Sequence, residues 1–415
     1  MKFDNQLRYA IQIVDAYKGG MPLHAWLKNF FREHRQMGSR DRKLLATLVY
    51  GFYRLGHAVK GLPPEERILA GLFLCQDGPH ELLQHFHPDW NEKAGLPLEE
   101  KIVFYQGQPA GTAFRVEDIF PWSAELSEGI DHRAFCLSFL RQPDLFLRIR
   151  PGYQQSVLAK LNSGTITNTS PASHPSSPVP HEFIPPFTLR LPNGFKVEDY
   201  FTPDHQVVIQ DYSSQHIASF LQPLPTSHAP LSFWDACAAS GGKSILAHDL
   251  HPSMAITVSD IRESILHNLR QRFQQAGIKK YHAFLADLTQ SPPQALSPGS
   301  PRTPAQGPPP FDLVLADVPC TGSGTWSRTP EELYFFDPRK IIHYSGMQKK
   351  IVSHIAANLA PDAWLVYSTC SVFKKENEEM AALLREKFGL QEDRIENIKG
   401  YDLRADSMFA ARFRR

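Results

Sequence analysis

Cysteines are few in this chain, and long apolar runs are missing. Five cysteines occur among 415 residues, and no two of them form a C-x-x-C pair. We therefore expect reduced thiols, with neither a disulfide framework nor a bound metal. No stretch of about 18 consecutive apolar residues is present, and the first residues, MKFDNQLRYA, have no apolar segment behind their charged start. These absences predict a cytoplasmic protein without a membrane-spanning segment.

A large net charge is also lacking, because the formal value is only +1. The distribution of charge is uneven: residues 1–60 hold eleven Lys and Arg against four Asp and Glu, whereas residues 61–140 hold five against thirteen. The basic segment FREHRQMGSRDRK at 31–43 is suited to neutralising phosphate groups. A solvated helix surface explains the same charges equally well.

The pattern of the sequence changes along its length and predicts three domains. Helical spacing of apolar residues predicts a helical domain at 1–142, and shorter β-type runs predict a small α+β linking domain at 143–205. From 206 to 415 apolar strands alternate with helical patterns, which is typical of a doubly wound, parallel α/β sheet. Two stretches rich in Pro, at 162–180 and 291–310, are expected to be surface insertions.

One end of the predicted sheet carries the residues suited to binding a cofactor. The segment WDACAASGGKS (234–244) places a glycine pair between a strand and a helix, where the backbone can approach a ligand closely. It is neither a G-x-G-x-x-G fingerprint nor a P-loop. The next strands end near Asp260, Asp287 and Asp317, and ligands of open α/β sheets bind at the carboxyl ends of strands. Asp260 is expected to bind ribose hydroxyls.

Two of the cysteines follow strands at the same edge of the sheet. Cys320 stands in DVPCTGSG and Cys370 in LVYSTCS, among turn-forming and small polar residues where an apolar filler has no obvious task. We expect both thiols to face the ligand cleft, with the access and the lowered pKa of a nucleophile. Their spacing does not say which one attacks. Cys75 and Cys136 are expected to be small buried apolar residues.

The motifs together resemble a known family. DACAASGGKS, SD at 259–260, AD at 286–287, DVPCTGSGTWSRTPE and YSTCSVFKKENEE are similar, in order and spacing, to the motifs of Sun/Nop-type RNA cytosine-5 methyltransferases, which use S-adenosylmethionine. VVIQDYSSQ (207–215) resembles the segment that precedes the catalytic sheet of that family, and the similarity covers roughly 145–415. SRDRKLLATLVYGFYRL (39–55) is similar to the helical, NusB-like RNA-binding domain of the RsmB (Fmu)-like branch.

The resemblance implies roles for the residues of the site. It assigns attack on cytosine C6 to Cys370, release of the product to Cys320, and contact with the amino edge of the base to Asp317. Asp287 is expected beside the adenine of the cofactor. The residues that the resemblance assigns to the cofactor are Cys237, Ala238, Ala239, Ser240, Gly241, Gly242, Lys243, Asp260, Asp287 and Asp317.

Three positions depart from the pattern of the family. Ser240 stands where Pro is usual, Val318 where Ala is usual, and ADSMFAARF (405–413) replaces an Asp-Gly-Phe-Phe segment. The last change alters the packing expected near the target base. Arg328, Lys374 and Lys375 are expected either to contact RNA phosphates or simply to lie at the surface.

The resemblance implies an enzyme that makes 5-methylcytosine in RNA, with 16S rRNA as the most expected target. The cytosine must be single-stranded or flipped out of its stack to be reached. We expect a monomer. Two alternatives stay open: a tRNA cytosine-5 methyltransferase, and a non-catalytic rRNA assembly factor with the same fold, although such a factor would need neither Cys320 nor Cys370.

Overall fold

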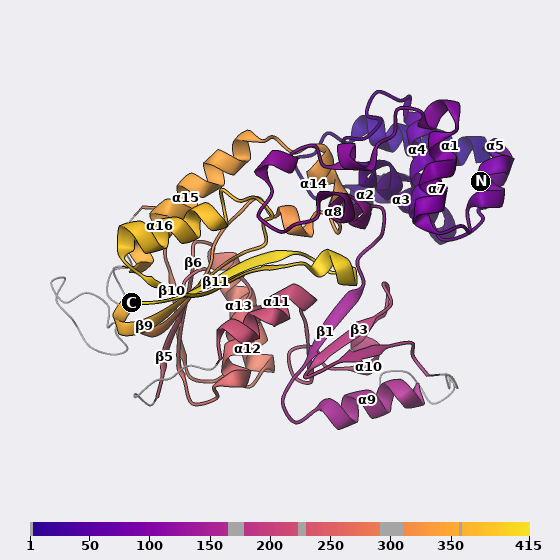
Figure 1. Ribbon diagram of the computed structural model, residues 1–415. Helices are drawn as coiled ribbons and strands as arrows, with labels where there is room; N and C mark the ends of the chain where they lie inside the picture. Colours follow the sequence, from indigo (N-terminus) through magenta and orange to yellow (C-terminus); the bar gives the residue numbers. More distant parts are fainter. Residues whose placement is uncertain (1–2, 165–177, 223–229, 291–310, 357–358) are drawn as a thin grey trace. The chain divides into compact units, whose positions relative to one another are not determined.

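The computed structural model describes residues 3–164, 178–222, 230–290, 311–356 and 359–415. Most of the first predicted insertion and all of the second lie outside the described residues. The chain divides into two compact units (Figure 1), and each is described by itself. The first consists of Met1–Leu126, Ile130–Pro143 and Thr325–Asp337, and the second of Ser127–Gly129, Asp144–Gly324 and Pro338–Arg415. The three-domain division remains a prediction.

The first unit is helical, which confirms the expected class of the N-terminal region. Its helices are α1 (Phe3–Ala16), α2 (Leu23–Glu33), α3 (Ser39–Arg54), α4 (Pro64–Cys75), α5 (Glu81–Phe86), α6 (Pro88–Lys93), α7 (Leu98–Gln106), α8 (His132–Phe139) and α14 (Pro330–Tyr334). Short 3-10 turns stand at η1 (Pro109–Gly111), η2 (Val116–Ile119) and η3 (Ser123–Glu125). Helix α14 comes from a part of the chain far from the other helices in sequence.

Two glycines let helices α3 and α4 approach closely. A Cβ atom on Gly71 would lie 2.5 Å from the backbone of Gly51, so a side chain there cannot be accommodated without moving a helix. Leu45, Leu48 and Leu72 are fully buried beside this contact. Burial of this apolar stripe is what stabilises the helices, because short helices are marginal in isolation.

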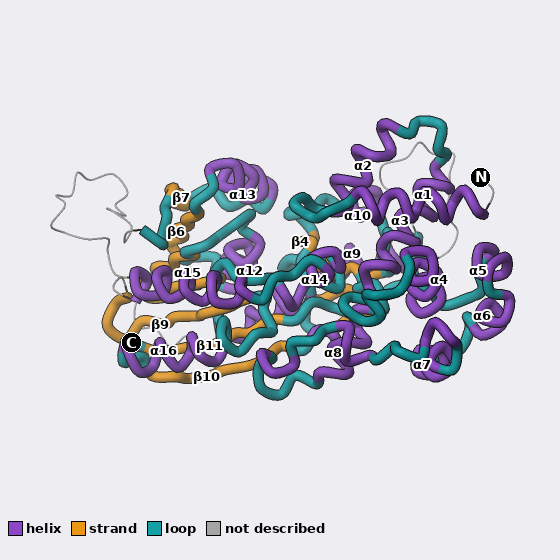
Figure 2. The backbone as a smooth tube through the Cα atoms, turned by 90° about the horizontal axis from the view of Figure 1, so that it is seen from above, coloured by secondary structure: helices purple, strands orange, loops and turns teal. Residues whose placement is uncertain are grey.

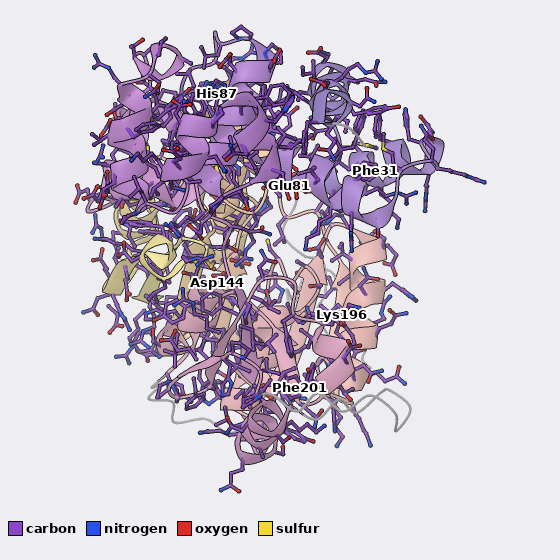
Figure 3. The ribbon with its side chains drawn as sticks, turned by 90° about the vertical axis from the view of Figure 1, so that its right-hand side faces the viewer. Phe31, Glu81, His87, Asp144, Lys196 and Phe201 are labelled. Atoms are coloured by element: carbon purple, nitrogen blue, oxygen red, sulfur yellow. The ribbon has the colours of Figure 1, made fainter. Side chains whose placement is uncertain are left out.

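The second unit contains a small antiparallel sheet with the strand order β2-β3-β1-β4. Its elements are β1 (Leu145–Ile149), α9 (Gln154–Ser163), β2 (Glu182–Ile184), β3 (Thr188–Leu191), α10 (Val197–Tyr200) and β4 (Val207–Ile209). Phe201 directly follows α10 and is buried in the core of this sheet. Figure 3 labels Phe201 and also Lys196, the residue before α10. Arg148 and Arg150 of this region both form ion pairs with Asp249, at 2.5 and 2.7 Å.

The large sheet of the second unit has seven strands in the order β10-β11-β9-β8-β5-β6-β7. The strands are β5 (Ser232–Asp235), β6 (Ala255–Asp260), β7 (Tyr281–Leu285), β8 (Phe311–Asp317), β9 (Leu359–Thr369), β10 (Gln391–Ile398) and β11 (Met408–Arg414). Five neighbouring strands, β9, β8, β5, β6 and β7, are parallel to one another. Strand β11 runs antiparallel to both of its neighbours, β9 and β10. Figure 2 shows β9, β11 and β10 side by side in orange. This is the Rossmann-like sheet expected.

Helices cover both faces of the large sheet. They are α11 (Tyr212–His216), α12 (Gly242–Leu250), α13 (Glu263–Gln275), α15 (Arg339–Ala356) and α16 (Glu378–Phe388), with short turns at η4 (Ile217–Phe220), η5 (Ser323–Thr325) and η6 (Gly400–Leu403). Successive strand residues point to opposite faces, so Phe233 packs into the core under α12 and α13, and Trp234 into the core under α15 and α16. Among the described residues, no helix is long and apolar enough to cross a membrane.

The chain order of the strands reverses between β5 and β8. In open α/β sheets this switch point, at the carboxyl ends of the strands, is where ligands bind, because the connections leave in opposite directions and open a crevice. The residues predicted for the site follow β5, β6, β7, β8 and β9.

Candidate active site

The loop after β5 depends on one glycine. Gly241 has a φ angle of +84° and stands directly before α12. A Cβ atom there would lie 2.8 Å from the ring of Phe273 and 3.0 Å from Leu269. Glycine is therefore required both by backbone conformation and by space. Neighbouring Ser240 accepts hydrogen bonds from Arg272 at its carbonyl and hydroxyl oxygens, which fixes the outer side of the loop.

Asp235, the last residue of β5, lies beneath this loop and is only 1% exposed. Its Oδ2 accepts a 2.6 Å hydrogen bond from Ser244, and its Oδ1 has no hydrogen-bond partner among the described residues. Burial raises the pKa of Asp235 to about 7, the Ser244 hydrogen bond opposes this rise, and the charge of Asp317 adds to it. Asp235 was not among the site residues predicted from the sequence, although it ends a strand as Asp260 and Asp317 do.

Asp260, at the end of β6, holds the loop from the other side. Its Oδ2 accepts from the backbone N–H of Ala239 at 3.0 Å, and its Oδ1 accepts from that of Arg262 at 2.9 Å. Ala239 has a φ of +45°, an unusual value for a residue with a side chain, and the contact with Asp260 holds it there. Asp260 thus positions the backbone as well as lining the cleft.

Asp317, at the end of β8, is held by two partners. Its Oδ2 is 2.7 Å from Nζ of Lys243, and its Oδ1 accepts a 2.7 Å hydrogen bond from Ser368 of β9. Burial lowers the pKa of the Lys243 ammonium, but the charge of Asp317 and its hydrogen bond outweigh this effect, and the pKa is raised. Lys243 is therefore a cation at neutral pH, fixed beside the carboxylate.

Cys320 and Cys370 lie together, with their sulfur atoms 3.4 Å apart. The pKa of the Cys320 thiol is raised well above its usual range, first by the hydrogen bond with Cys370 and second by burial. The expectation of a lowered pKa is therefore wrong for Cys320. The hydrogen bond between the two sulfur atoms stabilises the protonated thiol more than the thiolate. Cys370 is partly exposed.

A buried carboxyl group joins the two cysteine loops. Glu376 accepts hydrogen bonds from the backbone N–H of Thr321 at 3.0 Å and from its hydroxyl at 2.6 Å, and also from the hydroxyl of Ser371. Burial raises the pKa of Glu376, and these hydrogen bonds lower it in turn. Because Thr321 follows Cys320 and Ser371 follows Cys370, one side chain fixes the spacing of both loops. The sequence analysis did not assign Glu376 a role.

Asp260, Asp317, Cys320 and Cys370 border a cleft of about 510 Å³. Seven of the predicted site residues line it: Cys237, Ala239, Asp260, Asp287, Asp317, Cys320 and Cys370. The other predicted residues do not line it: Ala238, Ser240, Gly241, Gly242 and Lys243. Ala238 is buried and donates its N–H to Ser259, and Lys243 is directed to Asp317. Burial raises the pKa of Cys237 well above its usual range, so its thiol stays neutral.

The remaining wall of the cleft was missed by the sequence analysis. Tyr344, Met347 and Ile351 of α15 line it, together with Ile261 and Leu288 after β6 and β7. The three helix residues recur at spacings of three and four, which places them on one face. The same spacing is typical of a helix that packs on a core, so the pattern could not distinguish a cleft wall from buried packing.

Comparison with known proteins identifies the family. The model of 16S rRNA methyltransferase RsmB/F matches residues 219–411. Ribosomal RNA small subunit methyltransferase B of Xylella fastidiosa is 31% identical over 348 residues, which cover 83% of this chain and 72% of that protein. The chain belongs to the RsmB/F methyltransferase family. The protein of the same name from an Enterobacter species is 27% identical over 404 residues, covering 88% of this chain and 79% of that one.

Solved structures agree on the fold of this family member. The crystal structure of PH0851 covers 100% of this chain and 99% of its own, with a TM-score of 0.63 and 17% identity. A methyltransferase homolog protein from Pyrococcus horikoshii covers 76% of this chain and 97% of its own, with a TM-score of 0.52 and 18% identity. At such identities the likeness shows the fold, which is a Rossmann-like methyltransferase sheet.

Proposed function

We propose that this RsmB/F family member transfers a methyl group from S-adenosylmethionine to C5 of a cytosine in 16S rRNA. The observation that carries the proposal is the pair of sulfur atoms, 3.4 Å apart, at the edge of a cleft on the switch point of the sheet. Methylating C5 of a cytosine needs a nucleophile for C6 and a group that takes the C5 proton. Two adjacent thiols can divide these tasks. The relatives described above are named as rRNA small subunit methyltransferases.

The cleft suits S-adenosylmethionine in size and in chemistry. A volume of about 510 Å³ is within the range of small-molecule sites. Asp260 would hold the ribose hydroxyls and Asp287 the adenine edge, beside the apolar side chains of Ile261 and Leu288. The loop of residues 237–243 would surround the amino-acid part. When bound, the cofactor supplies an electrophilic methyl group on a positively charged sulfur, which the Asp317 carboxylate in the wall of the cleft favours.

Cys370 is the proposed nucleophile. Its thiolate adds to C6 of the cytosine, forming an S–C6 bond and moving the electrons of the 5,6 double bond so that C5 becomes nucleophilic. Lys243, a cation, lies near Cys370. Asp317 accepts a hydrogen bond from the amino group of the base in this proposal, and its pairing with Lys243 and Ser368 keeps the carboxylate in place.

Cys320 is the proposed group for product release. While Cys370 faces it, the shared proton raises the pKa of Cys320. Once the sulfur of Cys370 is bonded to C6, that cause is removed, and Cys320 can lose its proton to solvent. The Cys320 thiolate then takes the proton from C5, the C5–H electrons restore the 5,6 double bond, and the S–C6 bond breaks to return the Cys370 thiolate.

The deciding experiment is bisulfite sequencing of RNA from a strain that lacks the gene, with and without complementation. Loss of one 5-methylcytosine in 16S rRNA, restored by the wild-type chain, is the expected result. Loss of a tRNA methylation instead identifies the alternative substrate. An unchanged pattern in all RNA, together with a ribosome assembly defect, favours the non-catalytic assembly factor. Cytoplasmic location and the monomeric state remain predictions.

A further inference from the structure

The helical unit contains a polar pocket of about 300 Å³ that no part of the proposed reaction uses. One face of α3 forms its floor, since Lys43, Thr47, Tyr50 and Arg54 follow one another at spacings of four, three and four residues. The other described residues that line it are Ala46, Gly51, Cys75, Gln76, Gln142 and Arg328. Three of the lining residues are Lys or Arg, and none of those described is a carboxylate.

Arg54 is the buried cation among the residues that line this pocket. The side chain is only 5% exposed, and its Nη1 donates to the carbonyl oxygens of Phe139, Arg141 and Ser327 at 2.9 to 3.1 Å. Its described hydrogen bonds to protein groups all leave from Nη1, so Nε and Nη2 keep donor capacity on a residue that lines the pocket. A guanidinium presents five N–H donors in a planar fork, which matches phosphate oxygens.

The charge of Arg54 is only partly offset by the described residues, because no carboxylate among them pairs with it directly. It forms no described ion pair, and its burial lowers its pKa, which measures the cost of keeping a cation there. Glu331 is near enough to favour the charge, but its Oε1 accepts from the backbone N–H of Leu23 instead. Asp77 forms its ion pair with Arg141 at 3.2 Å. A buried charge without a counterion is costly, and an anion from outside the chain removes that cost.

We infer that this pocket binds a phosphate group, and that the group belongs to the backbone of the RNA substrate. That the phosphate belongs to the RNA substrate rests on the proposed function. That the pocket binds a phosphate group rests on the residues of the pocket alone. Arg54 supplies the directional donors, Lys43 and Arg328 supply further positive charge, and the hydroxyl of Tyr50 adds a neutral donor. The Thr47 hydroxyl donates to the carbonyl oxygen of Lys43 within α3, so Thr47 is not needed as a ligand. A phosphate contact of this kind fixes the register of an RNA without reading its sequence.

The test places a carboxylate in the pocket without removing Arg54, whose three carbonyl contacts support the fold. In the full-length chain, Thr47→Glu adds a negative charge at a half-buried position, and Thr47→Gln is the matched neutral control. Binding of a short, fluorescein-labelled, single-stranded oligoribonucleotide is measured by anisotropy across a range of salt concentrations. Thermal unfolding of each variant is measured with and without inorganic phosphate.

The expected result is that Thr47→Glu weakens RNA binding about ten-fold and reduces the salt slope by about 0.7, the value for one phosphate of a single strand, while Thr47→Gln stays within about two-fold of wild type. If inorganic phosphate stabilises wild type and Thr47→Gln but not Thr47→Glu, and RNA binding is equal in all three, the phosphate is a free ion and the RNA assignment is overturned. Equal RNA binding and no phosphate effect overturn the pocket itself. These readouts do not use methylation, so they fail independently of the proposed function.

Discussion

The cleft on the large sheet and the pocket in the helical unit gather opposite charges. The cleft region holds the carboxyl groups of Asp235, Asp260, Asp287 and Asp317, with Lys243 fixed to one of them. The pocket holds Lys43, Arg54 and Arg328 without a lining carboxylate. A chain with a net charge of +1 can therefore carry two strongly charged sites, because the field at a site depends on the groups within a Debye length rather than on the total. The acidic cleft suits a sulfonium cofactor and the basic pocket suits a phosphate.

The largest predicted effect separates chemistry from binding in the acidic cleft. Cys370→Ala is expected to reduce methyl transfer by at least about 1,000-fold, because it removes the proposed nucleophile. Cofactor binding, measured by calorimetry, and RNA binding, measured by anisotropy, are expected to stay within about two-fold of wild type. Cys136→Ala, which removes a buried thiol of the helical unit, is the control for loss of a cysteine. Substantial residual turnover by Cys370→Ala would refute its assignment.

Cys320→Ala is expected to stop the reaction at a later step than Cys370→Ala does, after the bond to the base has formed. The S–C6 bond forms but is not broken, so protein and RNA stay covalently joined and migrate as one band on a denaturing gel after incubation with cofactor. The double variant Cys320→Ala/Cys370→Ala is expected to give no such band. A gel identical to that of wild type would count against the release role of Cys320.

A third prediction concerns the buried Asp235. Its pKa is raised to about 7 in the folded protein, against about 3.9 in an unfolded chain. The folded protein therefore binds one more proton than the unfolded chain between about pH 4 and pH 7. The contribution of Asp235 to the free energy of unfolding of the wild type falls as the pH rises through that window. The amide in Asp235→Asn does not ionise, so its Tm relative to wild type is expected to rise from pH 5 to pH 8. Each pKa unit corresponds to about 1.4 kcal/mol.

The control for this titration is Asp89→Asn, which makes the same change at an exposed position of α6. Its Tm difference from wild type is expected to be the same at both pH values. If Asp235→Asn behaves like this control, the carboxyl of Asp235 is ionised in the folded protein at all pH values tested.

The smallest predicted effect lies in the basic pocket. Lys43 is exposed at its rim, so Lys43→Gln is expected to weaken RNA binding only about two- to four-fold and to lower the salt slope by no more than about 0.7. Lys93→Gln, an exposed lysine of α6 outside the pocket, is expected to change neither. Cofactor binding by Lys43→Gln is expected to equal that of wild type. Weaker cofactor binding by this variant would contradict the view that the cleft and the pocket bind different ligands.

Sequence patterns predicted the parallel part of the sheet, because β5, β6, β8 and β9 are apolar runs that end in polar or catalytic-type residues. They did not predict β10, whose sequence QEDRIENI holds few apolar residues. β10 is an edge strand, and most of its residues are exposed or half-buried, so it lacks the continuous apolar run of a strand that is buried on both faces. Its partner β11 was interpreted only as a departure from a family motif.

Long-range packing limited the prediction of both sites. Residues 325–337 follow the Cys320 loop in sequence, yet they belong to the helical unit. No local pattern indicates this, because α14 packs on α3, and its Glu331 accepts a hydrogen bond from the backbone N–H of Leu23, 308 residues earlier in the chain. Asp235 and Glu376 were missed for a related reason: their roles follow from burial and from hydrogen bonds between loops, and a single sequence displays neither.

The 3.4 Å between the sulfur atoms of Cys320 and Cys370 has a consequence for handling this protein. A disulfide needs a sulfur separation of about 2.05 Å, so a small side-chain movement brings the pair within bonding range. Hydrogen peroxide accepts the two electrons and two protons that the thiols give up, yielding water and an S–S bond that removes the proposed nucleophile and the proposed base together. Turnover assays consequently require a thiol reductant, and a purified sample that has stood in air is expected to regain its activity when dithiothreitol is added.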